Sequence, residues 1–160
     1  GKSKLGGENH ILNSSLKAII IRTSWVYSEF GNNFVKTMIR LGKERTELNV
    51  VDDQFGSPTY ARDLAEACLK IIRQPEKWSC TPKVYHYSNE GTISWHGFAK
   101  EIMIQAELKC QVLPIDTDSY PTRAPRPFYT VLDSVCVSDL FSLKDNPWKM
   151  SLQKMISSFH

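Results

Sequence analysis

Residues 18–27 read AIIIRTSWVY, and this stretch decides the fold. Its first four residues are apolar and mostly β-branched, which favours a strand buried on both faces in a parallel sheet between helices. The chain then changes abruptly to RTSW at 22–25. Ligands of open α/β sheets bind at the carboxyl ends of the strands, so this strand is expected to deliver polar and aromatic side chains to a site. The alternative is an ordinary strand followed by a loop with a packed tryptophan.

Outward from this stretch, apolar periodicities predict alternating strands and helices. Strands are expected at 18–22, 48–51, 84–87 and 112–115, and helices at 1–15, 34–45, 59–74, 94–108 and 147–159. Thr59 or Ser57 is the expected cap of the third helix, Ser94 of the fourth, and Asn146 of the last. The alternation predicts the α/β class.

The apolar positions of the first and last helices predict which faces are buried. Leu5, Ile11 and Leu12 are expected to face inward from the first helix. The last helix is expected to pack a core face made of Trp148, Leu152, Met155, Ile156 and Phe159.

Composition excludes several classes of protein. The 160 residues are 41% hydrophobic and 23% charged, with a formal net charge of +3, which is typical of a globular domain and too weakly basic to indicate nucleic-acid binding. No apolar run approaches the length of a membrane span. The four cysteines form no C-x-x-C pair, so we expect no metal site and reduced thiols in the cytoplasm.

The first residues of the chain lead us to expect that it is part of a longer protein. It does not begin with Met, and it opens in charged, helix-like sequence. A Gly-rich G-x-G-x-x-G turn does not occur in it. We therefore expect residues 1–160 to be a single C-terminal fragment of a longer protein whose Gly-rich part is absent here.

Four stretches taken together are far more specific than any one of them. They are GKSKL at 1–5 with Glu8, RTSWVY at 22–27, GNNFV at 31–35, and DQFGSPTYA at 53–61 followed by DL at 63–64. With these, the chain resembles the C-terminal part of the dTDP-4-dehydrorhamnose reductases, a family of extended short-chain dehydrogenase/reductases. SW at 94–95, YPT at 120–122, RP at 126–127 and VLD at 131–133 add to the resemblance.

The resemblance implies a fold and a catalytic pair. The fold is a Rossmann-like NAD(P)-binding sheet, of which this chain holds the end, interleaved with a substrate-binding lobe. The catalytic pair is Y-x-x-x-K, in which Lys4 matches the lysine and the tyrosine is the residue before Gly1. Residues four apart share a helix face. A cation beside a tyrosine favours the phenolate and lowers its pKa, which suits proton transfer at neutral pH.

The resemblance also implies roles for other side chains. Lys4, Thr23 and Ser24 are expected to contact NADPH or NADH, with Lys4 on the ribose hydroxyls. Trp25 is expected to line the sugar pocket, since an indole offers both a flat face and an N–H donor. The remaining substrate contacts are expected from Asn33, Gln54 and Arg126, the last on the pyrophosphate. Asp53 and the Thr59-Tyr60 pair are expected to be structural.

Three functional readings follow. The favoured one is hydride transfer from NAD(P)H to dTDP-4-dehydro-L-rhamnose by the full-length protein in the cytoplasm, the fragment alone being inactive. A second is a non-catalytic subunit that resembles the regulatory subunit of methionine adenosyltransferase. A third is a reductase or epimerase for another nucleotide sugar. We also expect the fragment to associate, with a homodimer as one candidate state, through the unpaired edge of the strand at 18–21.

Overall fold

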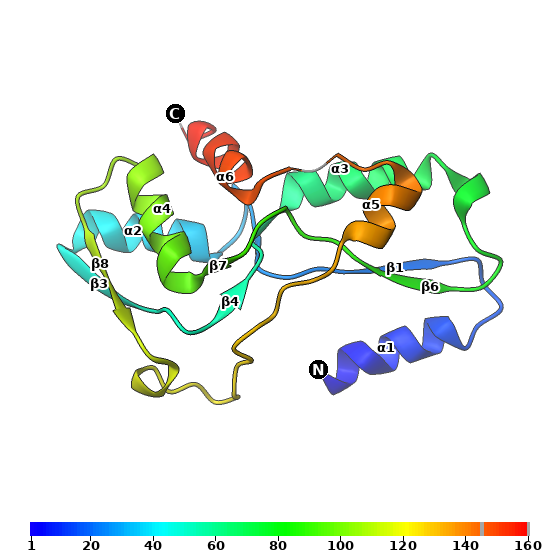
Figure 1. Ribbon diagram of the computed structural model, residues 1–160, viewed down its shortest axis with the longest axis horizontal. Coiled ribbons are helices and arrows are strands. Elements are labelled where there is room, and N and C mark those ends of the chain that lie inside the picture. Colours follow the sequence, from blue (N-terminus) through cyan, green and yellow to red (C-terminus); the bar gives the residue numbers. More distant parts are fainter. Residues whose placement is uncertain (145, 160) are drawn as a thin grey trace.

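Figure 1 shows two groups of helices and strands, connected by a chain that passes back and forth between them. The computed structural model describes residues 1–144 and 146–159. The helices are α1 (Lys2–Leu12), α2 (Phe34–Glu44), α3 (Ala61–Ile72), α4 (Trp95–Gln105), α5 (Val135–Phe141) and α6 (Trp148–Ser157). The strands are β1 (Ile19–Arg22), β2 (Val26–Tyr27), β3 (Glu47–Val51), β4 (Phe55–Gly56), β5 (Thr59–Tyr60), β6 (Lys83–His86), β7 (Ile93–Ser94) and β8 (Gln111–Ile115). Short 3-10 turns lie at Pro75–Lys77 and Thr117–Ser119. The predicted α/β class is confirmed.

The first core is built around the parallel pair β3–β8. Leu48 of β3 lies opposite Val112 of β8, and both side chains are buried. Helix α4 contacts both strands and also packs on α2 and α6. It contributes Phe98 and Ile102, which are almost completely shielded from solvent. Burying several such side chains, at about 1.5–3 kcal/mol each, is the main stabilising contribution to this half of the molecule.

The second core is built around the parallel pair β1–β6. Ile19 and Ile21 of β1, together with Tyr85 of β6, pack against buried residues of α3 and α5. Side chains alternate along a strand, so Ile20 and Arg22 point to the opposite face, where α1 lies. The predicted burial of this strand on both faces is wrong. Its three isoleucines are only partly buried. Ile20 lies on the face covered by α1, a helix that buries none of its own residues and so shields this face only loosely.

Helix α1 buries no residue among those described. Leu5, Ile11 and Leu12 are 52%, 38% and 37% exposed, so the prediction that they face inward is wrong. The contact that fixes α1 is polar. The guanidinium of Arg22 binds the carboxylate of Glu8 through both Nε and Nη2, with 2.5 Å between Nη2 and Oε2. This bidentate contact and the charge of Arg22 lower the pKa of the Glu8 carboxyl.

Two predicted helix caps differ from those found. The third helix begins at Ala61, because Thr59 and Tyr60 form β5 and pair with β2. Neither Thr59 nor Ser57 caps it. The hydroxyl of Ser57 donates instead to the carbonyl of Gly91, at 2.7 Å. In α6 the capping position is Pro147 rather than Asn146, a shift of one residue. The Ser94 cap of α4 is confirmed, since its Oγ accepts from the Gly97 N–H at 3.0 Å.

The predicted core face of the last helix is largely correct. Leu152, Met155 and Ile156 are buried, and Trp148 packs against the first core. Phe159 is 44% exposed and does not belong to it. It lies two residues past the end of α6, where the helical repeat no longer directs its side chain inward.

The edge of β1 remote from β6 pairs with no strand in the described part of the chain. Its backbone N–H and C=O groups are therefore available to a further strand. We expect the 160-residue chain, expressed by itself, to associate through this edge. Sedimentation velocity over a concentration series measures this, and a monodisperse monomer at all concentrations would contradict it.

Two buried tyrosines predict a loss of stability at high pH. Burial raises the pKa of both Tyr60 and Tyr87 from 10.0 to about 12. The unfolded chain releases these protons near pH 10 while the folded chain retains them, so the free energy of unfolding falls as pH rises from about 10 to 12. Tyr87→Phe should make this fall shallower in urea titrations, whereas Tyr129→Phe, at a 67% exposed position, should leave the slope unchanged.

Candidate active site

Four of the predicted site residues, Lys4 and the three that follow β1 at 23–25, lie near the carboxyl end of β1. Figure 1 shows α1 running along one side of the β1–β6 pair, with its first residues on the side where β1 ends. Glu8 of α1 is held by Arg22, the last residue of β1. Lys4 lies one helical turn before Glu8 and shares its face. The ion pair therefore places Lys4 near the carboxyl end of β1, directly after which Thr23 and Ser24 lie.

Lys4 is exposed, and its ammonium group makes no hydrogen bond or ion pair with any other described residue. By contrast, the nearby charged side chains of Glu8 and Arg22 form an ion pair with each other. A lysine that points along this face without a partner has all three N–H donors available to a ligand. This is what the predicted contact with ribose hydroxyls requires.

Thr23 supplies an independent sign of a ligand at this edge. Its hydroxyl oxygen is buried and has no hydrogen-bond partner among the described residues. An unsatisfied buried hydroxyl costs about 1–3 kcal/mol, so such groups usually have a partner. The neighbouring Ser24 hydroxyl makes only a long contact, 3.4 Å, to the carbonyl of Ser57. The two hydroxyls and the Lys4 ammonium therefore offer hydrogen-bonding groups to a polar ligand.

Trp25 adopts a constrained position. Its backbone φ is +49°, in the left-handed region that non-glycine residues rarely occupy and that clusters at functional sites. Its ring stacks on that of Trp95, with centroids 3.5 Å apart and planes 10° from parallel. One face of the indole is therefore covered by Trp95 and is closed to a ligand. The indole N–H of Trp25 makes no hydrogen bond within residues 1–144 and 146–159.

The indole ring of Trp25 packs directly against Gly56. A Cβ at position 56 would come within 2.5 Å of the Trp25 ring and 2.8 Å of the Thr130 hydroxyl. We expect Gly56→Ala to lower the free energy of unfolding by about 1–3 kcal/mol and to displace the tryptophan. Urea denaturation with near-ultraviolet circular dichroism measures both effects. Gly7→Ala, at an open helical position, is the matched control, and an equal loss there would contradict the packing explanation.

Asn33 and Gln54 already have protein partners. The Oδ1 of Asn33 caps α2 by accepting from the Lys36 N–H at 3.1 Å, and its Nδ2 donates to the carbonyl of Ser28 at 2.7 Å. The Nε2 of Gln54 donates to the Thr117 hydroxyl at 2.9 Å. The structure thus accounts for both side chains without a ligand, and their contact with substrate stays a prediction.

Asp53 has the structural position that the sequence predicts. Its carboxylate accepts from the Thr117 hydroxyl at 2.6 Å and from the Thr117 N–H at 3.0 Å. These bonds lower the pKa of Asp53. They fix the start of the 3-10 turn Thr117–Ser119. They thereby set the direction in which the proline-rich segment, residues 116–127 with prolines at 121, 125 and 127, leaves β8.

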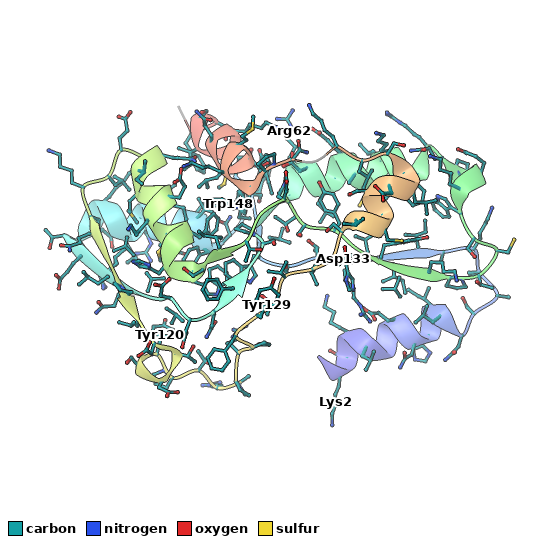
Figure 2. The ribbon with its side chains drawn as sticks, viewed as in Figure 1. Lys2, Arg62, Tyr120, Tyr129, Asp133 and Trp148 are labelled. Carbon is teal, nitrogen blue, oxygen red and sulfur yellow. The ribbon has the colours of Figure 1, made fainter. Side chains whose placement is uncertain are left out.

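Arg126 lies on this proline-rich segment, which is anchored beside Trp25. The backbone of Phe55 in β4 donates to the carbonyl of Phe128 at 2.7 Å and accepts from the N–H of Thr130 at 2.8 Å. Figure 2 shows Tyr120 and Tyr129 along the same segment, on the side of the molecule where α1 begins. Arg126 is exposed, and no ion pair joins it to another described residue.

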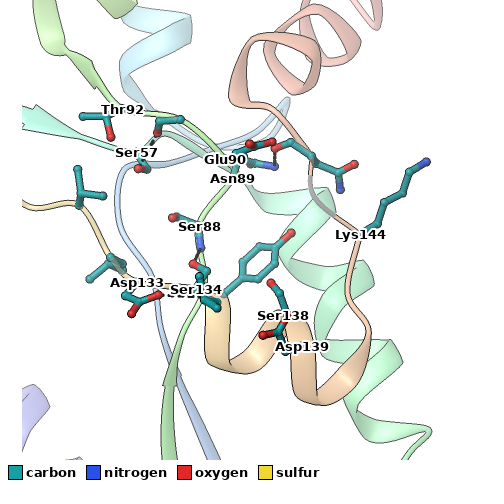
Figure 3. Close-up of a pocket in the computed structure, with 16 residues that line it drawn as sticks. Ser57, Ser88, Asn89, Glu90, Thr92, Asp133, Ser134, Ser138, Asp139 and Lys144 are labelled. Atoms are coloured by element: carbon teal, nitrogen blue, oxygen red, sulfur yellow. Dashed lines mark hydrogen bonds between the residues drawn. The ribbon is translucent and has the colours of Figure 1, made fainter.

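Residues at 131–134, which the sequence did not predict as a site, line a cavity of about 350 Å³. Its other walls come from Ser57, residues 87–92, α5 and residues 144 and 146 (Figure 3). None of the predicted site residues lines it. The rule that pointed to the end of β1 applies equally to the end of β6, where Ser88 and Asn89 follow, and it would have indicated these residues.

A buried polar network connects α3 and α6 to the loop after β6. The carboxylate of Asp63, 3% exposed, accepts from the Nδ2 of Asn89 at 2.7 Å and from the Ser151 hydroxyl at 2.5 Å. The Oδ1 of Asn89 accepts from the backbone N–H of Tyr60 at 2.7 Å. Asn89 thereby satisfies both a buried carboxylate and a buried backbone donor.

The described residues form neither a metal centre nor a membrane-spanning helix. In the part of the chain that the structure describes, no three His, Cys, Asp or Glu side chains gather closely enough to hold a metal ion. No helix among the same residues is long and apolar enough to cross a bilayer.

Comparison with known proteins gives a consistent result. A family model described as the RmlD substrate binding domain matches residues 1–160. The spore coat polysaccharide biosynthesis protein SpsK of Bacillus subtilis (strain 168) is 41% identical over 156 residues, which are 98% of this chain and 53% of that protein. The dTDP-4-dehydrorhamnose reductase of Aggregatibacter actinomycetemcomitans is 39% identical over 97% of this chain and 55% of its own length.

A solved structure agrees with these relatives. The crystal structure of dTDP-4-dehydrorhamnose reductase from Bacillus anthracis str. Ames, in complex with NADP, is 40% identical and superposes with a TM-score of 0.88. The match covers 100% of this chain and 55% of that one. The chain thus spans about half the length of the relatives that it matches.

Proposed function

The chain belongs to the RmlD substrate binding domain family, and on that premise we propose that the full-length protein reduces dTDP-4-dehydro-L-rhamnose to dTDP-L-rhamnose with NADPH or NADH. The resemblance seen in the sequence is thereby confirmed. The observation that carries the proposal is the placement of Lys4 and the unpartnered Thr23 hydroxyl at one edge of the sheet. Relatives that are named dTDP-4-dehydrorhamnose reductase support the choice of sugar.

The nicotinamide, when bound, supplies a hydride to the C4 carbonyl carbon of the sugar. In the proposed reaction the ammonium of Lys4 holds the ribose hydroxyls and lies one turn from the tyrosine position of the motif. Its positive charge lowers the pKa of that tyrosine, which donates its proton to the carbonyl oxygen as the C–H bond forms. The Thr23 and Ser24 hydroxyls bind polar groups of the nicotinamide nucleotide.

The substrate side of the proposal rests on Trp25 and Arg126. Trp25 lies beside the segment that carries Arg126, because β4 contacts both. The guanidinium of Arg126, which has no ion-pair partner among the described residues, suits bidentate binding of a pyrophosphate oxygen pair. Trp25 offers its uncovered ring surface to the sugar. Gln54 lies next to Phe55 and is a secondary candidate, whereas the capping role of Asn33 makes it the weakest of the four.

The test is NAD(P)H oxidation by the purified full-length protein with dTDP-4-dehydro-L-rhamnose, followed at 340 nm and compared with a reaction that lacks the sugar. Turnover with formation of dTDP-L-rhamnose is the expected result. Folded protein that binds NADPH without turnover would favour the non-catalytic subunit or another nucleotide sugar. Calorimetric titration with dTDP distinguishes these two alternatives, because only an enzyme for another nucleotide sugar requires a nucleotide site.

The cellular setting is part of the proposal. Free thiols at all four cysteines are consistent with a cytoplasmic protein, and the polysaccharide role in the name of the SpsK relative is consistent with sugar-nucleotide supply. A homodimer remains a candidate assembly, and we expect neither nucleic acid nor a membrane among its partners.

A further inference from the structure

The cavity at the end of β6 lies across the β1–β6 pair from Lys4. Tyr87, which lines the cavity, follows β6 two residues after Tyr85, so both side chains point to the side of the second core. Arg22, opposite His86 in the register, points to the other side and binds α1. The cavity and the lysine that defines the proposed active site thus occupy opposite faces of the strand pair, and the cavity requires an explanation of its own.

Its walls carry polar groups that the fold leaves available. The side chains of Ser138 and Asp139 on α5 make no hydrogen bond with another described residue. The Ser134 hydroxyl accepts from the N–H of Ser88 at 3.0 Å and retains its own proton for donation. One oxygen of Asp133 accepts from the Val135 N–H, the first of α5, at 3.0 Å, which leaves the other oxygen for a ligand. Figure 3 shows these groups arranged around one opening.

The charge of the lining selects against anions. Glu90, Asp133 and Asp139 contribute three carboxylates, and Lys144 contributes one ammonium. A pyrophosphate would meet net repulsion here. The nucleotide portion of the proposed substrate is therefore a poor occupant, in contrast to the segment that carries Arg126. Neutral hydroxyl groups, which donate to carboxylates and accept from Ser and Lys, fit the lining better.

The apolar groups and the size of the cavity narrow the ligand further. Val131, Leu132 and Val135 add an apolar surface beside the hydroxyls and carboxylates. A pyranose has the same mixed surface, with C–H groups on its faces and hydroxyls around its edge. The volume of about 350 Å³ lies near the lower end of the range for ligand sites, about 300–1,000 Å³. We propose that this cavity binds a neutral carbohydrate of monosaccharide size at a site separate from the proposed active site.

The proposal does not depend on the proposed reductase activity, and its test measures binding alone. The probes are the methyl pyranosides of D-glucose, D-galactose and L-rhamnose, titrated against the full-length protein by saturation-transfer difference NMR. The expected result is saturable binding of at least one of them, undisturbed by excess dTDP. The double variant Ser138→Ala/Asp139→Asn should weaken it by about tenfold or more, because it removes a hydroxyl and a charged acceptor.

Asp118→Asn, at an exposed position outside the cavity, is the matched control and should bind as the wild type does. Neither of the α5 side chains contributes a hydrogen bond to the fold among the described residues, so the double variant should remain folded. Saturable binding by none of the three pyranosides would overturn the proposal. Displacement by dTDP would also overturn it, by placing the sugar in the nucleotide site. Tighter binding of ethanolamine than of any pyranoside, lost in the double variant, would show a cation site instead.

Discussion

Lys4→Ala in the full-length protein should lower kcat for the proposed reduction by about 10²–10⁴-fold, the usual contribution of a positioned acid–base system. The reason lies in two effects that one side chain supplies. Its charge favours the ionised form of the motif tyrosine, and its donors hold the ribose of the cofactor. Both losses fall on the chemical step more than on sugar binding, so KM for the sugar nucleotide should change little.

Lys2→Ala is the matched control for this variant. Lys2 is exposed on the same helix, and Figure 2 shows its side chain pointing away from the molecule. It should retain wild-type kcat. The rate of reduction should also fall with rising pH over a higher range in Lys4→Ala than in the wild type, because the tyrosine must be protonated to act as the acid and its pKa lies closer to its ordinary value without the lysine. A Lys4→Ala enzyme as fast as Lys2→Ala would refute the assigned role.

Asn89→Ala should lower the free energy of unfolding by about 3–5 kcal/mol, the range seen when a buried charge loses a partner. The substitution removes the amide that donates to the Asp63 carboxylate at 2.7 Å and leaves the Tyr60 N–H without its acceptor. The Asp63 carboxylate and the Tyr60 N–H are both buried, so water cannot replace the lost bonds unless α3 and α6 separate.

Urea denaturation followed by circular dichroism measures this loss, and Asn32→Ala, in an exposed loop, is the control. The variant Asn89→Asp tests the direction in which stability changes with pH. Burial beside the negatively charged Asp63 raises the folded-state pKa of the newly introduced carboxyl above its value in the unfolded chain. Folded protein then binds more protons, so the variant should gain stability as pH falls from 7 toward 4. Equal destabilisation at both pH values would contradict this explanation.

Long periodic segments made much of the fold predictable. The apolar repeats of 34–45 and 94–108 gave α2 and α4 correctly, and the β-branched run at 18–22 gave β1. The two-residue strands β2, β4, β5 and β7 were missed because so short a pairing has no periodicity of its own. Helix α5 was missed for the same reason, since its seven residues complete only two turns.

The proposed site could be inferred from the sequence only where its residues are neighbours or belong to one motif. Thr23, Ser24 and Trp25 follow one strand, and Lys4 belongs to one motif. The bond that brings Lys4 to them, between Arg22 and Glu8, joins residues 14 apart, and no local pattern indicates it. The cavity at the end of β6 draws its walls from three separate parts of the chain, residue 57, residues 87–92 and residues between 131 and 146, so it could be recognised only once the fold was known.

The passage of the chain between the two cores has a consequence for how such proteins can evolve. The elements of the two cores alternate along the chain. The second core takes β1, then α3 and β6, then α5, and the first core takes the intervening α2 and β3, then α4 and β8, and finally α6. A single genetic crossover between two diverged parents would therefore leave both cores of the hybrid with residues from each parent. A single crossover within this alternation therefore cannot exchange one core and leave the other intact.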